Sequence, residues 1–459
     1  MLDKPKIVFS FAELTTIMKI RRSWVIVGLS FLFAGCAQMT PFYGNSKNPQ
    51  NSIQRKDGFS LAFVEFGEQG SYQDPTQIKN AVKLIKSTPR PLVVTYVHGW
   101  QNNARSGDAE RFSGLLRDLS ESEIVRKAHF NVIGVYLGWR GQLTKIPVIK
   151  ELTFLSRKAA AERLASNFDC YDAIATVSET ARKYHNADGQ YTILLGHSFG
   201  GLVVERSVAH AINAEIHGHS EPAKSLPADL ILLLNPASDS ILTRQMIAAL
   251  YSRHLENTRE FVVSLTSRAD AATGVAFPIG TSLAALTKGF NDVRVPGVAV
   301  HSENERVFFT TTPGHNKFLI NHETEDKHKT WPGLGKTAFD VNLSHNLVGH
   351  AFTIDDGAGG LKLWHFQPVG AVNLPYWDVA VDPSIIKDHG DIWNERARAM
   401  MAAIFRMNIP GEMAGAMRSA SVGMVGKAPA IPTEPATMEP KPNLNRKPDY
   451  SRLVPSQQQ

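Results

Sequence analysis

The stretch Gly196-His197-Ser198-Phe199-Gly200-Gly201 decides the fold that we predict for this chain. It follows an apolar run over residues 191–195 and precedes an amphipathic run over residues 202–212, so a strand, a tight turn and a helix are expected in that order. The pattern G-x-S-x-G in this setting is typical of a nucleophilic serine held on a strained turn above a sheet. Ser198 is therefore the predicted nucleophile, and a glycine-rich turn without chemistry is the alternative.

The composition is that of a globular protein with enough apolar residues for a large core. The 459 residues are 43% hydrophobic and 20% charged, and the formal net charge is +6. The excess of Lys and Arg lies in residues 1–35 and 411–459, whereas the middle of the chain is close to neutral. We therefore expect no basic face that binds nucleic acid. Cys170 lies in a helical pattern, where a small buried thiol is expected.

The N-terminus has the pattern of a secretory signal. A basic cluster at residues 18–22 is followed by a short apolar run at residues 24–35 and then by Cys36. A cysteine after Ala-Gly resembles the lipobox of bacterial lipoproteins. This resemblance implies that Cys36 becomes an acylated N-terminus attached to a membrane of the bacterial cell envelope. A segment that starts at residue 18 would by itself be a complete signal. One interpretation is therefore that residues 1–17 come from a misassigned translation start. An uncleaved anchor is the other interpretation.

Strands that alternate with helices organise the body of the chain. Apolar, β-branched runs predict buried strands, and the helical patterns between them favour a mostly parallel sheet covered by helices on both faces. We therefore predict an α/β, doubly wound fold. The expected strands lie at residues 59–66, 92–97, 130–137, 191–195, 230–234, 261–265 and 376–381, and the expected helices at residues 74–86, 109–124, 157–184, 202–212 and 394–407.

Shifts in composition predict the boundaries of the domain. We assign residues 1–35 to the signal, 36–56 to a flexible polar tether, 57–410 to one α/β domain and 411–459 to a disordered Pro- and Ala-rich tail. Within the domain, residues 281–374 are expected to form an insertion between the last two strands, in which a small hairpin would fit. An apolar segment at residues 146–155 is a candidate lid.

A nucleophilic serine requires a base and an acid that orients the base. Both are sought at the carboxyl ends of the strands, because open parallel sheets bind their ligands there. Asp270 follows the strand at residues 261–265 and is the predicted acid, with Asp239 as the rival. His389 follows the last strand and precedes the final helix, so it is the predicted base. Four histidines of the insertion compete for this role: His315, His345, His350 and His365.

An oxyanion hole requires two backbone N–H groups near the nucleophile. The N–H of Phe199 is one expected donor. The N–H of Trp100 is the other, because the turn His98-Gly99-Trp100 ends the strand at residues 92–97. We expect the His98 side chain to bond this turn rather than to titrate in a reaction. The sequence contains no H-E-x-x-H pattern and no paired cysteines, so we predict neither a metal nor a cofactor.

Taken together, His98-Gly99-Trp100, residues 196–201, Asp270 and His389-Gly390-Asp391-Ile392 resemble the α/β-hydrolase superfamily, in particular its bacterial serine esterases and lipases. The resemblance spans about residues 57–407 apart from the insertion. It implies a Ser-His-Asp triad that hydrolyses a small-molecule or lipid carboxylic ester or thioester through an acyl-enzyme, without a cofactor. A peptidase or amidase of the same fold, and a non-catalytic envelope protein that keeps the fold, are the alternatives.

Overall fold

The computed structural model describes residues 41–44, 49–143, 153–185, 191–218, 228–252, 261–298, 301–331, 336–344, 350–369 and 374–408. The predicted signal, Cys36 and the predicted tail lie outside these ranges, as does most of the candidate lid. None of the helices within the ranges combines the length and the apolar character that crossing a membrane requires.

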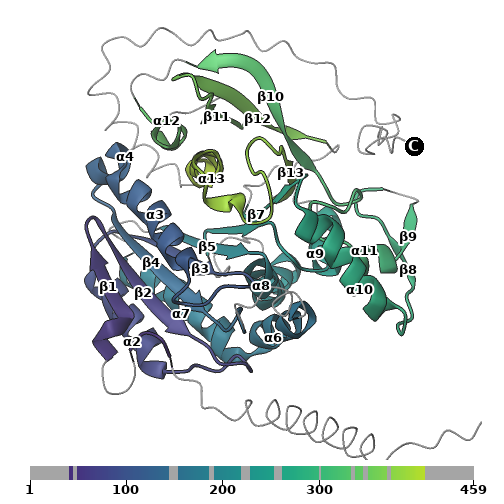
Figure 1. Cartoon of the computed structure of the whole chain (residues 1–459), viewed down its shortest axis with the longest axis horizontal. Helices are drawn as coiled ribbons and strands as arrows, with labels where there is room; N and C mark the ends of the chain where they lie inside the picture. The colour runs from purple at the N-terminus through teal and green to yellow at the C-terminus, as the bar shows by residue number, and fades with distance from the viewer. Residues whose placement is uncertain are drawn as a thin grey trace, which may run out of the picture. The chain divides into compact units, whose positions relative to one another are not determined.

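A sheet of 11 strands forms the centre of the described chain (Figure 1). Its strand order is β1-β2-β4-β3-β5-β6-β7-β13-β10-β12-β11, and all neighbours from β2 to β10 are parallel. The mostly parallel α/β fold predicted from the sequence is therefore confirmed. The strands are β1 (Ile53–Lys56), β2 (Phe59–Glu65), β3 (Pro91–Val97), β4 (Asn131–Gly138), β5 (Tyr191–His197), β6 (Leu230–Leu234), β7 (Val262–Ser267), β10 (His322–Trp331), β11 (Ala351–Asp355), β12 (Leu361–Pro368) and β13 (Tyr376–Val381).

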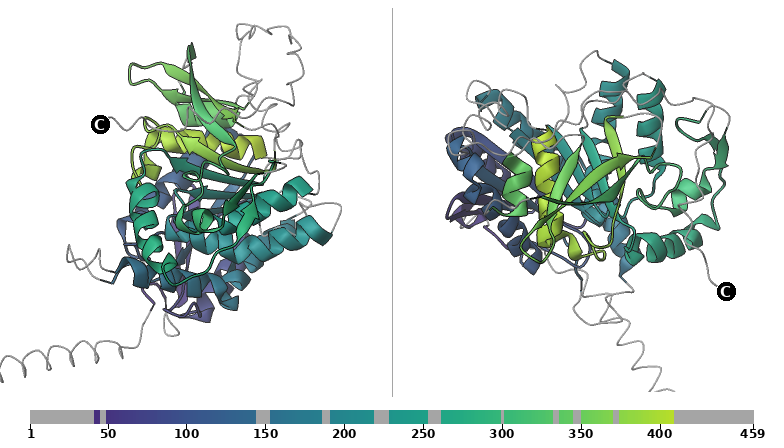
Figure 2. Two further views of the ribbon diagram at one scale, coloured as in Figure 1. Left: turned by 90° about the vertical axis from the view of Figure 1, so that its right-hand side faces the viewer. Right: turned by 90° about the horizontal axis from the view of Figure 1, so that it is seen from above.

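Helices pack against both faces of this sheet (Figure 2). The first face carries α3 (Gly107–Glu121), α4 (Glu123–Lys127), α12 (Ala338–Ser344) and α13 (Glu395–Asn408). The second carries α2 (Pro75–Ser87), α6 (Phe154–Ser166), α7 (Phe168–His185), α8 (Phe199–Gly218) and α9 (Ile241–Ser252). In β3, Leu92 and Val94 face the first core while Val93 and Val97 face the second. Burial on both faces explains why the strands appear in the sequence as continuous apolar runs.

Capping side chains set the bounds of several helices. Asp74 accepts a hydrogen bond from the Thr76 N–H (2.9 Å) and Pro75 occupies the first turn, so α2 begins where the sequence predicts. The single helix predicted over residues 157–184 is divided into α6 and α7. Asn167 adopts an extended conformation there and its side chain accepts from the Asp169 N–H (2.9 Å), which ends one helix and caps the next.

The last part of the predicted tether belongs to the folded domain. Residues 49–52 form the short helix η2, and β1, which lies within the stretch that we expected to be flexible, pairs antiparallel with β2. The two strands are joined by Asp57-Gly58, and Gly58 has a φ of +78°. Asp-Gly is a preferred two-residue hairpin connection because glycine adopts positive φ without steric cost.

Part of the predicted insertion continues the central sheet. Residues 281–374 lie between β7 and β13 in sequence and include a two-stranded hairpin, β8 (Asp292–Arg294) with β9 (Ser302–Asn304). However, β10 pairs in parallel with β13 through His322 and Glu323, and antiparallel with β12, which pairs in turn with β11. The sequence analysis did not predict β10, because this strand is polar and mostly exposed beyond residue 324.

Candidate active site

Ser198 occupies a strained turn between β5 and α8. Its φ is +57°, a left-handed conformation that costs a non-glycine residue roughly 1–2 kcal/mol. The Ser198 N–H donates to the carbonyl of Leu234 (3.1 Å), and its own carbonyl accepts from the Ala237 N–H (3.0 Å). Close approach also requires glycine, because a Cβ on Gly200 would lie 2.0 Å from the carbonyl oxygen of Val97. The surrounding structure therefore holds Ser198 in a conformation that it would not adopt by itself.

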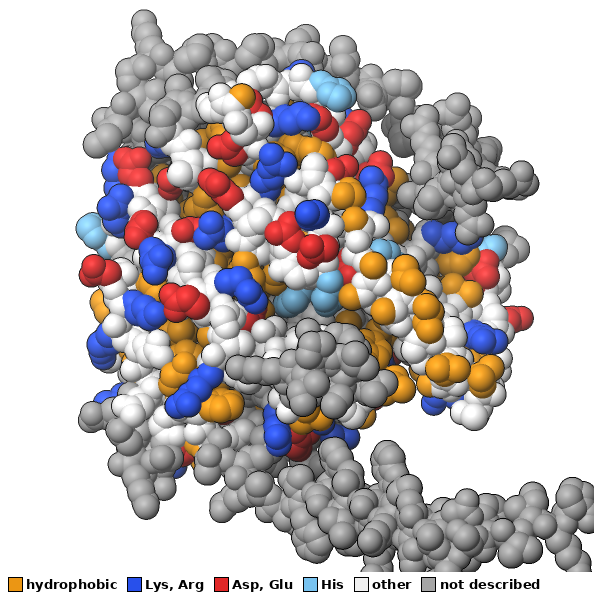
Figure 3. All heavy atoms as spheres, in the orientation of Figure 1, with side chains coloured by type: hydrophobic (Ala, Val, Ile, Leu, Met, Phe, Trp, Pro, Cys, Tyr) orange, Lys and Arg blue, Asp and Glu red, His pale blue; other side chains and the backbone are white. Residues whose placement is uncertain are grey.

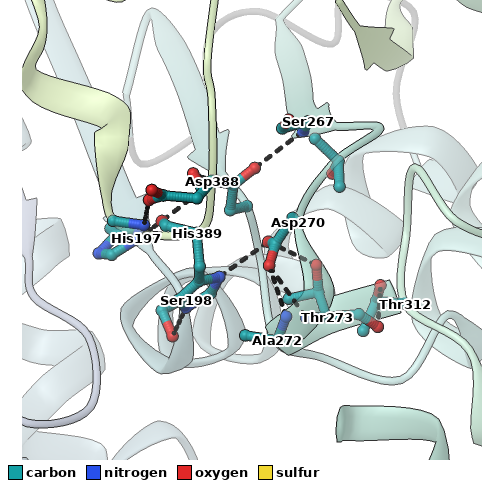
Figure 4. A network of polar contacts seen from close by, with 12 residues as sticks. His197, Ser198, Ser267, Asp270, Ala272, Thr273, Thr312, Asp388 and His389 are labelled. Carbon is teal, nitrogen blue, oxygen red and sulfur yellow. Dashed lines mark hydrogen bonds and ion pairs between the residues drawn. The ribbon is translucent and has the colours of Figure 1, made fainter. Parts of the chain in front are cut away.

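Three of the predicted residues converge at the carboxyl edge of the sheet (Figure 4). His389 Nε2 lies 2.7 Å from Ser198 Oγ, although 191 positions separate the two residues. On the other side of the ring, His389 Nδ1 lies 2.8 Å from Asp270 Oδ2. Because an ionised carboxylate only accepts hydrogen bonds, Nδ1 carries the proton of the neutral imidazole. Nε2 is then an acceptor, and the Ser198 hydroxyl donates to it.

Asp270 is buried, and its carboxylate is fully bonded. Oδ1 accepts from the N–H groups of Ala272 (2.9 Å) and Thr273 (3.1 Å), and Oδ2 accepts from the Thr273 hydroxyl (2.5 Å) in addition to His389. Burial alone would raise the pKa of Asp270, but the hydrogen bonds from His389 and Thr273 outweigh burial and hold that pKa below its ordinary value. Asp270 is therefore ionised at neutral pH.

A second histidine lies behind this carboxylate. His315 Nε2 is 3.1 Å from the Thr273 hydroxyl oxygen. Since Thr273 gives its own proton to Asp270, the hydroxyl oxygen can only accept here, and His315 Nε2 must donate. Burial lowers the pKa of His315, which keeps the ring neutral. Its ring packs against Gly274, where a Cβ would lie 2.8 Å from His315 Cε1.

The loop that carries His389 is fastened to the ends of three neighbouring strands. The His389 carbonyl accepts from His197 Nε2 (2.9 Å) and from Asn235 Nδ2 (3.0 Å), and the Ser267 hydroxyl donates to the Ile386 carbonyl (2.6 Å). Burial, together with the nearby His389, lowers the pKa of His197 to about 4, so this ring is neutral. Sequence reasoning missed these three positions. Their available signal was a polar residue at the carboxyl end of each apolar strand.

The rival residues have other partners. Asp239 Oδ2 accepts from Arg206 Nη2 at 2.7 Å, so its carboxylate is engaged away from His389. The His350 ring packs edge-on against Trp377, and His365 lies on β12. His345 falls outside the described residues.

The turn after β3 lies directly against the serine. A Cβ on Gly99 would be 2.6 Å from Ser198 Cβ, so only glycine fits there. As expected, His98 bonds this turn: its Nδ1 lies 2.9 Å from the Gly99 carbonyl, and its Nε2 accepts from the Trp139 N–H (3.0 Å). Burial lowers the pKa of His98, which keeps it neutral. Among the turn, loop and cap hydrogen bonds of the described chain, none engages the N–H of Trp100 or of Phe199.

Aromatic rings form one side of the site. Phe154 packs against Phe199 and Trp100 with ring centroids 5.2 and 5.4 Å away, and Trp100 lies 6.4 Å from Phe199. This aromatic cluster is joined to the serine turn through Phe199, the residue after Ser198, and through Trp100, the residue after Gly99. Within the described ranges, no three His, Cys, Asp or Glu side chains gather in a way that could hold a metal ion.

The comparisons with known proteins found few similarities. No protein-family model matches the chain, and no curated protein sequence matches it. Two solved structures of phospholipase PlaB from Legionella pneumophila are similar to parts of it. The one in complex with thio-NAD has 13% identity and a TM-score of 0.25, covering 52% of this chain and 47% of that one. The other has 9% identity and a TM-score of 0.22, covering 64% and 93%. This chain thus spans about half the length of the first, and at these TM-scores the likeness carries no argument about function.

Proposed function

We propose that this protein is a serine hydrolase that cleaves carboxylic esters or thioesters through an acyl-enzyme. One observation carries the proposal: a single imidazole, that of His389, bridges the Ser198 hydroxyl at 2.7 Å and the buried Asp270 carboxylate at 2.8 Å. The strained turn at Ser198 supports it, because such strain persists where a side chain must be presented for chemistry. The apolar rings of Trp100, Phe154 and Phe199 favour an acyl or aromatic ester.

The reaction follows from the protonation states of these groups. Ser198 Oγ attacks the ester carbonyl carbon while its proton passes to His389 Nε2, and Asp270 remains ionised beside the imidazolium. The N–H groups of Trp100 and Phe199 donate to the oxyanion, assisted by the positive end of helix α8. Collapse of this intermediate breaks the ester C–O bond, and the leaving alcohol takes the proton from His389. Water then repeats the sequence on the acyl-enzyme, which releases the acid and restores Ser198.

A fluorophosphonate probe tests the proposal directly, because it reacts with an activated serine without requiring knowledge of the substrate. We expect the full chain to be labelled at Ser198, and a Ser198→Ala variant to remain unlabelled. His389→Ala should label far more slowly, because the base is missing, whereas His365→Ala serves as a matched histidine control and should label normally. Equal labelling of wild type and Ser198→Ala would refute the proposal.

We also propose that an acyl group on Cys36 attaches the protein to a membrane of the bacterial cell envelope. The support is the sequence pattern of a basic cluster, an apolar run and Ala-Gly before the cysteine. Cys36→Ser should move the protein from the membrane fraction to the soluble fraction and abolish labelling by a fatty-acid analogue. Cys170→Ser is the control, since this thiol is buried and should not affect fractionation. Unchanged fractionation and labelling of Cys36→Ser would contradict the anchor.

A further inference from the structure

An apolar face with no covering element among the described residues runs beside the candidate site. It lies on the helix η3 (Ala272–Ala276), the helix α10 (Phe277–Ala285) and the turn that follows. Its members are 56–72% exposed and share one side of this segment: Val275, Ile279, Leu283 and Leu286. We call these four side chains the α10 face. Figure 3 shows hydrophobic side chains gathered over α10. Their spacing of four, four and three residues is the spacing that aligns side chains along a helix.

The opposite side of the same segment is buried in the protein. It carries Phe277, Thr281 and Ala285, so the helix is anchored by a mainly apolar side while it exposes the α10 face. Residues 271–291 contain no Asp or Glu, and Lys288 is their only charged residue. A helix that carries apolar side chains on its exposed side as well as on its buried side is normally covered there by protein or by lipid. Contiguous exposed apolar surface of this kind marks an interaction site.

The α10 face continues toward the serine through packed rings. A Cβ on Gly280 would lie 3.3 Å from Phe154 Cε1 and 3.9 Å from the exposed Leu155, so α10 rests on the start of α6. Phe154 in turn packs against Phe199, the residue after Ser198. At the other end of the segment, η3 begins two residues after Asp270, whose carboxylate accepts from the N–H groups of Ala272 and Thr273. The segment that carries the α10 face is therefore linked to Asp270 along the chain, and to the residue after Ser198 through Phe154.

We propose that the α10 face docks on the surface of a phospholipid bilayer and so presents membrane-borne acyl esters to Ser198. This proposal rests on the proposed hydrolase activity and names its substrate class. A narrow aliphatic row without carboxylates, ended by a lysine, suits the boundary between headgroups and acyl chains. A stable interface between two copies would need about 800 Å² on each partner and a polar rim. Four side chains in a single row supply neither.

The test uses the full chain with Cys36→Ser, so that no acyl anchor contributes. The double variant Ile279→Ser, Leu283→Ser should bind phosphatidylcholine–phosphatidylglycerol vesicles at least about tenfold more weakly. The reason is that burying one aliphatic side chain in the bilayer contributes more binding free energy than a tenfold change in Kd requires. Hydrolysis of a long-chain ester in these vesicles should fall in parallel, while a soluble short-chain ester is cleaved as before. Phe168→Ser removes a more exposed aromatic side chain (73%) from α7 and is the matched control.

A fluorophore separates docking from activity. Leu283→Cys in the same background can be labelled selectively, because Cys170 is buried. Its emission should shift to the blue when vesicles are added, even if no ester is hydrolysed, which distinguishes failure of docking from failure of the hydrolase proposal. Unchanged vesicle binding of the double variant, or no emission shift, would overturn the docking proposal. So would light scattering that shows a dimer for the parent and a monomer for the double variant, because the face would then join two copies.

A separate observation concerns His315. We infer that His315 is a positioning residue: by donating to the Thr273 hydroxyl oxygen at 3.1 Å, it directs the Thr273 proton onto Asp270 Oδ2. If the ring were removed, the hydroxyl could rotate and leave Asp270 with one partner fewer. The carboxylate would then hold the Nδ1–H of His389 in a less defined direction. This inference also rests on the proposed activity.

Two variants of similar size test the role of His315. His315→Gln keeps an N–H donor near the position of Nε2 and should retain kcat within about threefold, whereas His315→Phe should lower kcat roughly tenfold with KM unchanged, as expected for one lost hydrogen bond. Thr273→Val should cause a similar loss, with little further loss in the double variant. If Ser198→Ala abolishes activity but His315→Phe does not alter kcat, or if His315→Gln is equally impaired, the positioning role is wrong while the hydrolase proposal stands. Thr273→Val decides the matter if His315→Phe does not fold.

Discussion

Two loops leave the sheet at the same edge, one after β6 and one after β7, and each carries an aspartate that could serve as the acid. The loop after β6 is bound to helix α8. There Asp239 pairs with Arg206 at 2.7 Å, and the Ser238 hydroxyl donates to the buried Glu205 carboxylate at 2.5 Å. Both α8 residues lie two turns beyond Ser198. The polar side chains of this loop, Ser238 and Asp239, therefore fasten it to the helix.

The loop after β7 uses the same kinds of group differently. Asp270 is bonded by its own following residues, Ala272 and Thr273, so its carboxylate needs no cation from α8. One direction remains open on Oδ2, and His389 fills it. The comparison teaches that the partner of a carboxylate, rather than its place at the end of a strand, separates an anchoring aspartate from one that orients an imidazole.

Removal of the nucleophile should have the largest effect. Ser198→Ala should lower the rate of p-nitrophenyl ester hydrolysis by about 10⁴-fold or more, because the site between the two loops then lacks its attacking group. Its melting temperature should stay close to that of the wild type. Steady-state kinetics and calorimetry on the same preparation measure the rate and the melting temperature. Near-normal turnover would show that Ser198 is not the nucleophile, and the two aspartates could then not be compared as its acid.

The two aspartates should differ by orders of magnitude. Asp270→Asn should lower kcat by about 10³–10⁴-fold, since the amide no longer holds His389 in the required tautomer. Asp239→Asn should leave kcat within a fewfold of the wild type and mainly weaken the link to Arg206. The paired kinetic measurement sharpens the comparison, because the opposite ranking would assign the acid to the loop after β6.

Two buried carboxyl groups should give the protein a pH-dependent stability: Glu205 on α8, which bonds Ser238 of the loop after β6, and Asp378 on β13. Burial raises the pKa of Glu205, and likewise that of Asp378, to about 7. Folded protein therefore holds two protons that the unfolded chain has lost, so stability is greatest below their ordinary pKa values and falls as pH rises through about 7. Glu205 should account for about 3 kcal/mol of this loss and Asp378 for about 4 kcal/mol.

Glu205→Gln should keep the stability measured at pH 5, where Glu205 is protonated, and lose roughly half of the decrease between pH 5 and 8. Urea unfolding at the two pH values measures both quantities. An unchanged decrease in Glu205→Gln would show that the Glu205 carboxyl group, which accepts from Ser238, does not titrate in this range.

The smallest effect concerns the strain at the turn that both loops surround. Ser198→Gly should be more stable than Ser198→Ala by about 1 kcal/mol, because glycine adopts a φ of +57° without steric cost. Both variants lack the nucleophile, so their unfolding free energies can be compared without regard to activity. Equal stability would mean that the strain is relieved elsewhere in the turn.

Much of the core followed from local sequence. The buried parallel strands were recognisable because they are apolar on both faces. The turn at Ser198 was recognisable by its glycines, which the fold requires because a Cβ on Gly200 would lie 2.0 Å from the Val97 carbonyl oxygen. The polar strand β10 and the edge strand β1 were not, since each is stabilised by pairing with a neighbour rather than by its own apolar pattern. The same holds for Asn167, whose capping role depends on how its backbone is turned.

The sequence by itself determined which residue types stand at the carboxyl edge of the sheet: a serine between glycines, two aspartates and a late histidine. Only the tertiary structure decided how they combine. Hydrogen-bond partners are set by spatial neighbours from distant parts of the chain, and these brought Arg206 to Asp239, His389 to Asp270, and His197 and Asn235 to the loop that holds the base. Spacing along the chain carries no information about such contacts, because a carboxylate has the same local signature with either partner.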